Sequence, residues 1–176
     1  MTSEYSSVAV LLAAHNGMMW LEEQIESILS QKSILVKIFI SVDFSNDKTY
    51  DWCQNLAKKN TRVNVLPYGN TFGGAAKNFF HLIQNVDFLG FDYISLADQD
   101  DIWNDEKLHY AIETIKMEDL DGYSSNVIAF WSNGRKKLVK KSFPQKKFDY
   151  YFEAAGPGCT YVFKQQAIQK FKKFLI

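Results

Sequence analysis

The chain has 176 residues, of which 47% are hydrophobic and 15% aromatic, enough for one folded domain with a sizeable core. Its 20 basic and 20 acidic residues cancel, so no overall field recruits nucleic acid, and anion binding must come from a local site or a metal. Only two cysteines are present, Cys53 and Cys159, and no apolar run is long enough to cross a bilayer. We therefore expect a soluble, cytoplasmic domain with reduced thiols and no signal peptide.

Stretches typical of buried strands alternate with stretches typical of helices. The run VAVLLAA is apolar throughout, as in a strand covered on both faces, whereas WLEEQIESILSQ repeats its apolar residues at helical spacing. In chain order we expect strands at 8–14, 35–42, 62–66, 91–97 and 126–132, and helices at 20–31, 47–59, 75–86, 105–117 and 164–175. This alternation predicts an α/β fold with a mostly parallel, Rossmann-like central sheet and helices on both faces.

Polar side chains follow three of the expected strands at the point where each ends. His15 and Asn16 follow the first strand, Asp43 and Ser45 the second, and the sequence ADQDD follows the fourth. Because the carboxyl ends of parallel strands share one edge of a sheet, these groups should converge on one crevice. The alternative is that the loops are polar only because they cap the helices that follow them.

The aspartates of LADQDDIW repel one another unless a positive charge lies among them. Hard carboxylate oxygens suit Mg²⁺ or Mn²⁺, which are commonly held by one or two carboxylates and substrate phosphates. The cluster therefore indicates a divalent cation that binds a diphosphate. The alternative is that Asp100 or Asp101 caps the next helix.

Several segments, in the right order, resemble glycosyltransferase family 2, the inverting nucleotide-sugar-dependent enzymes with a GT-A fold, and in particular its rhamnosyltransferase-like branch. VLLAAHNGMMWLEEQIESILSQ is similar to the family's first strand, its T-Y-N-G-like turn and the following helix. ISVDFSNDKT resembles S-D-D-G-S-x-D-G-T, and GNTFGGAAKNF resembles N-x-G-x-x-x-[RK]-N. LADQDDIW is an almost unaltered D-x-D-D-x-W signature, and GPGCTYVF resembles the G-C-T strand on the acceptor side.

The resemblance implies roles for particular residues. It implies a nucleotide-sugar site formed by Ala14, His15, Asn16, Asp43, Ser45, Lys77, Asp98 and Gln99, and a Mn²⁺ or Mg²⁺ ion bound by Asp100. Within this set, His15 would stack on the base and Lys77 would supply a positive charge near the nucleotide. For Lys77 the alternative is an ordinary solvated helix lysine.

An inverting transfer also needs a general base that deprotonates the acceptor hydroxyl. In the family this is an acid downstream of the G-C-T strand, often in an H-D-x-W-like motif, and no such motif follows GPGCTYVF. Asp149 and Glu153 are the nearby acids, but both precede that segment. We therefore expect a single GT-A-type domain over 1–176 that stops before its base, with a nucleotide-sugar-binding half at 1–104 and a partial acceptor half at 105–176.

Three functions are compatible with these features. The leading hypothesis is metal-dependent, inverting transfer of a sugar from a dTDP- or UDP-sugar to a saccharide or lipid-linked acceptor in cell-surface polysaccharide synthesis. The second is a catalytically impaired relative that binds nucleotide sugars or forms complexes. The third is a nucleotidyltransferase, which the lack of a glycine-rich phosphate loop near the N-terminus disfavours.

The segment from Arg135 to Lys147 contains seven basic residues. They indicate either a solvated hairpin or attraction to an anionic membrane or a lipid-linked acceptor, and membrane attraction would place the protein peripherally at the inner face. Apolar surface left exposed where the chain stops would also favour a homo-oligomer.

Overall fold

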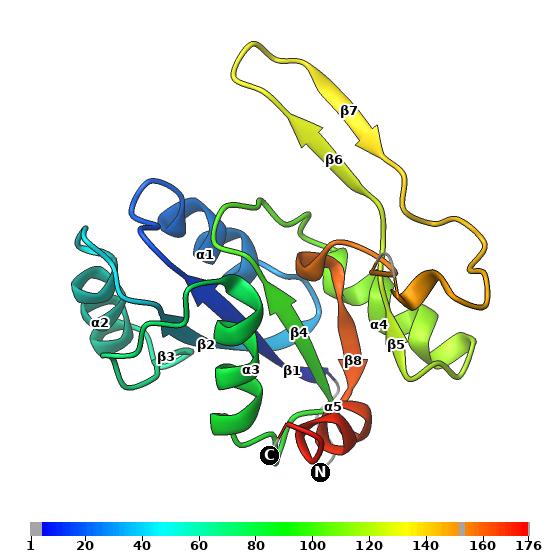
Figure 1. Ribbon diagram of the computed structural model, residues 1–176, viewed down its shortest axis with the longest axis horizontal. Coiled ribbons are helices and arrows are strands. Elements are labelled where there is room, and N and C mark those ends of the chain that lie inside the picture. Colours follow the sequence, from blue (N-terminus) through cyan, green and yellow to red (C-terminus); the bar gives the residue numbers. More distant parts are fainter. Residues whose placement is uncertain (1–4, 152–153, 176) are drawn as a thin grey trace.

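The computed structural model describes residues 5–151 and 154–175 of the chain. At its centre lies a six-stranded sheet in the order β3–β2–β1–β4–β8–β5 (Figure 1). Its strands are β1 (Ser6–Ala14), β2 (Ile34–Val42), β3 (Val63–Val65), β4 (Tyr93–Ala97), β5 (Gly122–Tyr123) and β8 (Val162–Lys164). β1 to β4 are mutually parallel, whereas β8 runs antiparallel to both β4 and β5. The mostly parallel sheet expected from the sequence is confirmed.

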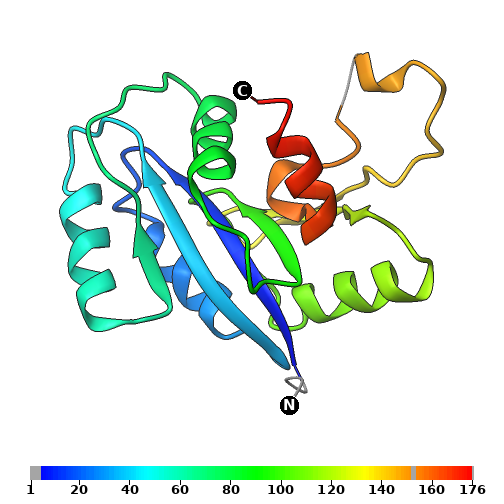
Figure 2. The same cartoon turned by 90° about the horizontal axis from the view of Figure 1, so that it is seen from below.

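Helices cover both faces of the sheet (Figure 2). The helices α1 (Leu21–Leu29), α2 (Thr49–Lys59) and α4 (Lys107–Met117) pack with one apolar cluster, and α3 (Ala75–Asn85) and α5 (Gln165–Lys172) with the other. Consecutive residues of β1 point to opposite faces, so Leu12 joins the first cluster and Leu11 the second. Both are fully buried and contribute about 2 kcal/mol each. This rigid strand carries the turn that forms one wall of the site.

The expected fifth strand at 126–132 is wrong as a member of the central sheet. Its residues form β6 (Val127–Phe130), which pairs only with β7 (Lys136–Val139) in a separate antiparallel hairpin. The hairpin projects from the body at the top of Figure 1. Local turn chemistry explains the difference, because Asn133 and Gly134 lie between the strands and Gly134 adopts a left-handed φ of 81°. The positions beside β4 are filled instead by β8 and β5.

The segment expected as a G-C-T strand is also different. Gly158–Thr160 forms a short 3₁₀ helix, η2, and strand β8 begins only at Val162. Thr160 explains this locally, since its backbone N–H and its hydroxyl both donate to the Pro157 carbonyl, at 3.0 and 2.8 Å. Over the described residues, no helix is both long and apolar enough to span a membrane.

Candidate functional site

A pocket of about 610 Å³ lies where β1, β2 and β4 end. This is the carboxyl edge of the parallel strands, where open α/β sheets form their ligand sites. Six of the residues expected at the site line the pocket: Ala14, His15, Asp43, Asp98, Gln99 and Asp100. Three others, Asn16, Ser45 and Lys77, are outside its lining. The loops that follow β1, β2 and β4 therefore meet at this pocket, as expected.

The turn after β1 is fixed by Gln99, the residue between the first two aspartates. The Gln99 side-chain carbonyl accepts a hydrogen bond from the His15 backbone N–H at 2.7 Å, and its amide donates to the His15 carbonyl at 2.9 Å. Gly17 permits this approach, because a Cβ at that position would lie 2.5 Å from Gln99 Oε1. Gln99 thus joins the β1 turn to the aspartate loop, and His15 remains exposed at the pocket wall.

Asn16 and Ser45 support the pocket from behind. Asn16 has a left-handed φ of 46°, a conformation that Asn tolerates better than most residues. Its backbone N–H donates to Ser45 Oγ at 3.0 Å, and its side-chain carbonyl accepts from the Asn46 N–H at 2.8 Å. The Ser45 hydroxyl in turn donates to the Asp43 carbonyl at 2.8 Å. These bonds hold the turns after β1 and β2 against each other.

Asp43 is buried and ties the β2 loop to the loop before α3. Its Oδ1 accepts from the backbone N–H groups of Phe44 and Phe72, each at 2.8 Å, and its Oδ2 accepts from Gly73 at 3.1 Å. Gly73 has a φ of +69°, which suits glycine at this turn. The carboxylate therefore orders the glycine loop that lines the pocket, besides presenting its edge to a ligand.

Helix α3 contributes Asn78, which sequence reasoning had not included. Lys77, the residue chosen there, is exposed on the first turn of α3. Asn78 is 2% exposed and lines the pocket, and its amide donates to the Ser41 carbonyl at 3.1 Å. Its side-chain oxygen is buried and has no hydrogen-bond partner within 5–151 and 154–175. The signal was available, because Asn78 is the last residue of the N-x-G-x-x-x-[RK]-N resemblance.

The aspartate loop is electrostatically strained. Burial and the charges of Asp101 and Asp100 raise the pKa of Asp98 to about 6. A hydrogen bond from the Cys159 backbone N–H acts in the opposite direction and lowers this pKa. Asp100 is exposed at the pocket lining. A nearby cation would relieve the repulsion and favour the charged form of Asp98.

Asp101 does not line the pocket; it lies near Cys159 and the Lys107 side chain. One ligand atom each of Asp98, Asp101 and Cys159 lies within 4.8 Å of the others. Burial lowers the pKa of the neighbouring Lys107 to about 7, although the charge of Asp101 opposes this shift. The Lys107 ammonium lies 3.3 Å from the centroid of the Trp103 ring, and among the residues that the structure describes it has no hydrogen-bond partner. Trp103 is buried and packs in the apolar core.

These contacts discriminate between two places for a divalent ion. Burial and hydrogen bonding to Asp101 raise the pKa of the Cys159 thiol, so it is a neutral, soft group that suits Mg²⁺ or Mn²⁺ poorly. In its protonated form, Lys107 also repels a metal ion at Asp101 and Cys159. Asp98 and Asp100, by contrast, are oxygen donors at the open pocket. The donor chemistry therefore fits a hard cation on the pocket side of the loop.

Of the two acids considered as a general base, the structure describes only Asp149, which does not line the pocket. Asp149 lies in a 3₁₀ helix, η1 (Asp149–Tyr151), where its carboxylate accepts from the Lys146 N–H at 2.8 Å. Glu153 lies outside the described residues. Among the residues described, the carboxylates that line the pocket are those of Asp43, Asp98 and Asp100.

Comparison with known sequences identifies the relatives of the chain. The family described as Glycosyl transferase family 2 matches residues 9–174. The dTDP-rhamnosyl transferase RfbG of Shigella flexneri is 49% identical over 166 residues, which cover 94% of this chain and 57% of that protein. Glycosyltransferase GlyG of Streptococcus pneumoniae serotype 4 is 27% identical over 115 residues, covering 65% and 36%. The chain thus spans about half the length, or less, of these curated relatives.

Solved structures agree on the fold. TarS 1–349 of S. aureus has a TM-score of 0.67 at 17% identity, with 94% of this chain and 49% of that chain covered. Its complex with UDP-GlcNAc gives the same TM-score and identity, with 94% and 47% covered. The mannosyltransferase PcManGT from Pyrobaculum calidifontis, in complex with GDP-Man and Mn²⁺, gives 0.64 at 13% identity, with 93% and 46% covered. The expected GT-A arrangement is confirmed.

Proposed function

This chain belongs to glycosyl transferase family 2, and from that premise we propose that it transfers a sugar from a nucleotide-diphosphate donor with inversion. The observation that supports the proposal most directly is the pocket at the strand ends, which brings Asp43, Asp98 and Asp100 together from two loops. A net-neutral protein needs such a local site to bind a diphosphate.

We propose a dTDP-sugar as the donor, with a UDP-sugar as the alternative. The relative with 49% identity is named a dTDP-rhamnosyl transferase, which makes dTDP-rhamnose the first donor to test. The exposed His15 ring at the pocket lining is suited to stacking on the base, and the buried oxygen of Asn78 to accepting a hydrogen bond. Lys77 remains a predicted contact to the nucleotide, made from the first turn of α3.

The proposed reaction depends on Mn²⁺ or Mg²⁺ held by Asp100, with Asp98 beside it. When bound, the ion would stabilise the negative charge of the departing nucleotide diphosphate. Gln99 holds the turn after β1 next to these two carboxylates through its two hydrogen bonds to the His15 backbone. An acceptor hydroxyl attacks the anomeric carbon from the face opposite the diphosphate and gives its proton to a base. We assign that base to no residue.

The proposed acceptor is a saccharide or lipid-linked saccharide used in cell-surface polysaccharide synthesis. A lipid-linked acceptor would bring the protein to the cytoplasmic face of a membrane. Residues 1–104 would form the donor-binding half and residues 105–176 the acceptor side, since the pocket lining belongs to the first half.

Calorimetric titration of the 176-residue chain with dTDP and UDP, each with Mn²⁺ and with EDTA, tests the donor site. We expect metal-dependent binding that D100N weakens by about tenfold or more, because a charged ligand contact is worth about 1.5–3 kcal/mol. D51N is the matched control, since Asp51 is an exposed acid on α2. Binding that is equal with and without metal, or equal in D100N and wild type, would contradict the metal-dependent site.

A transfer assay separates the enzyme from a relative that only binds nucleotide sugars. The protein is incubated with dTDP-rhamnose, Mn²⁺ and a lipid-linked saccharide, and the product is examined by NMR. We expect release of dTDP and a product of inverted anomeric configuration. Tight donor binding without dTDP release would favour the catalytically impaired relative instead.

A further inference from the structure

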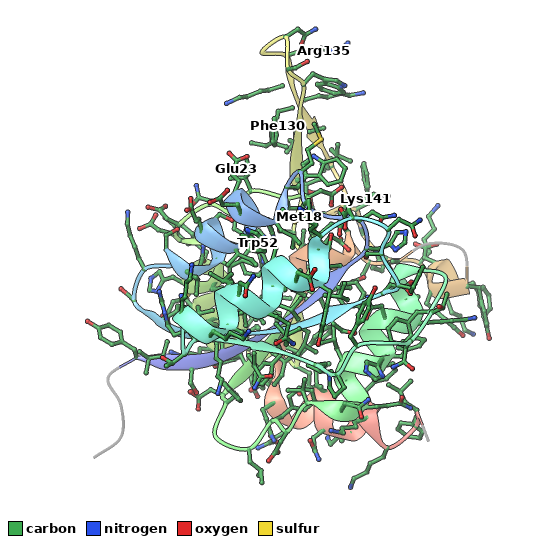
Figure 3. The ribbon with its side chains drawn as sticks, turned by 90° about the vertical axis from the view of Figure 1, so that its left-hand side faces the viewer. Met18, Glu23, Trp52, Phe130, Arg135 and Lys141 are labelled. Atoms are coloured by element: carbon green, nitrogen blue, oxygen red, sulfur yellow. The ribbon has the colours of Figure 1, made fainter. Side chains whose placement is uncertain are left out.

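The β6–β7 hairpin extends away from the body of the protein as a separate two-stranded sheet. Figure 1 and Figure 3 show it rising from the body in two perpendicular views, with Phe130 along its length, Arg135 near its tip and Lys141 near its base. An isolated two-stranded hairpin is only marginally stable in water. We therefore expect the hairpin to be stabilised by contact with a partner.

One face of the hairpin is apolar and exposed. In the register of the two strands, Ile128 is opposite Leu138 and Phe130 is opposite Lys136, so these four side chains share a face. Ile128, Phe130 and Leu138 are 61%, 55% and 59% exposed. The other face, with Val127 and Val139, is half-buried. Three large apolar side chains are thus presented outward in one cluster.

The segment that contains this apolar face is basic. Between residues 122 and 148 the chain has seven Lys or Arg residues and no Asp or Glu, although the whole chain is neutral. Three of these cations lie over exposed aromatic rings: Arg135 over Trp131 at 5.1 Å, Lys140 over Phe143 at 5.1 Å and Lys147 over Phe148 at 5.4 Å. Aromatic rings and long basic side chains together are typical of the boundary between water and lipid.

We propose that the β6–β7 hairpin docks on an anionic membrane surface, with Ile128, Phe130 and Leu138 inserted among the headgroups and the Lys and Arg side chains at the lipid phosphates. Charge complementarity selects this occupant. A second copy of the same surface would bring the Lys and Arg side chains of two β6–β7 hairpins together, which is repulsive. An anionic leaflet attracts each of them.

The docking would also orient the donor pocket. The hairpin rises on the side of the body toward which β1 and β4 point, which is the edge that carries the pocket (Figure 1). Membrane contact through the hairpin therefore turns the pocket edge toward the bilayer. This orientation, though not the docking itself, rests on the proposed use of a lipid-linked acceptor.

Vesicle co-sedimentation of the 176-residue chain tests the docking without any nucleotide or transfer. Vesicles of phosphatidylcholine mixed with phosphatidylglycerol are compared with vesicles of phosphatidylcholine alone. We expect binding only to the anionic vesicles, and its loss between about 0.1 M and about 1 M salt, where the screening length falls from about 10 to about 3 Å. K136Q/K137Q should weaken it about 25-fold, at about fivefold per lysine.

Matched variants separate docking from general effects of charge or exposed apolar surface. K58Q/K59Q removes two exposed lysines from α2 and should leave the binding unchanged. I128S/F130S, which keeps every charge, should weaken the binding about tenfold or more. Burying each of these apolar side chains in the membrane contributes up to about 2 kcal/mol to the free energy of binding. L89S/M117S replaces two side chains that are each 79% exposed outside the hairpin and should have no effect.

Three results would overturn the proposal. The first is equal binding to neutral and anionic vesicles, and the second is equal loss in the hairpin variants and their controls. The third is a dimer in light scattering that I128S/F130S dissociates, which would make the face a contact between copies. Since no step uses a nucleotide, a negative result here leaves the donor-site titration unaffected, and the reverse also holds.

Discussion

Replacing Asp98 by Asn should stabilise the fold while removing a proposed ligand-binding carboxylate. Asp98 is held in a partly buried position beside Asp100 and Asp101, and its pKa is raised from 3.8 to about 6. At neutral pH the folded chain therefore carries a charge that the unfolded chain tolerates better. Asn has nearly the same shape as the neutral carboxyl group and can still accept the Cys159 backbone hydrogen bond.

The expected gain follows from the pKa. A rise from 3.8 to about 6 corresponds to about 3 kcal/mol at 1.36 kcal/mol per pH unit, and we halve this to about 1.5 kcal/mol because the carboxylate is partly exposed to solvent. A carboxyl group whose pKa is raised by folding binds its proton more tightly in the folded chain. Its stabilising contribution is full below the unfolded pKa of about 3.8 and is lost as the pH rises through about 6.

Urea unfolding in EDTA, at about pH 7.5 and at about pH 4.5, measures both parts of this prediction. D98N should be more stable than wild type by about 1.5 kcal/mol at the higher pH, and the difference should shrink at the lower pH, where Asp98 is protonated. Taking the difference between the two proteins cancels the other titrating groups. No gain at about pH 7.5, or a gain that does not change with pH, would refute the electrostatic account of this loop.

Two further substitutions and one labelling experiment test the packing of the chain. G17A should lower the free energy of unfolding in urea by about 1–2 kcal/mol, because the added Cβ displaces Gln99 from His15. G74A, whose Cβ has nothing within 4 Å, should lower it little, and equal losses in the two variants would contradict this account. Q24M should raise the free energy of unfolding by about 1 kcal/mol, since both amide atoms of the fully buried Gln24 lack hydrogen-bond partners in the described part of the chain; a loss of stability would indicate a polar partner there. The thiols of Cys53 and Cys159 are buried, and burial raises the pKa of Cys53 to about 12, so Ellman's reagent should label neither until urea unfolds the chain; rapid labelling of the native protein would disagree.

The sequence by itself determined the sheet and the edge that carries the site. Continuous apolar runs such as residues 8–14 can be buried only between two helix layers, and parallel strands place the polar residues that follow them at one edge. The motif LADQDDIW also indicated the family, which the match over residues 9–174 confirms. The particular roles of Asp100, Lys77 and the other predicted ligand residues remain predictions.

Only the tertiary structure decided which polar groups face the pocket and which support it. Asp43 bonds to Phe72 and Gly73, some thirty positions along the chain, and Asp101 lies near Cys159 through an antiparallel strand that local patterns did not predict. Burial depends on such long-range contacts, and so does the pKa of Asp98. Strand pairing can instead follow a local turn: the turn at Asn133 and Gly134 pairs β6 with β7, so residues 126–132 contribute a strand to a projecting hairpin and not to the central sheet. Hydrophobic periodicity identifies a strand, but its partner is set by turn chemistry and by the neighbours that the fold provides.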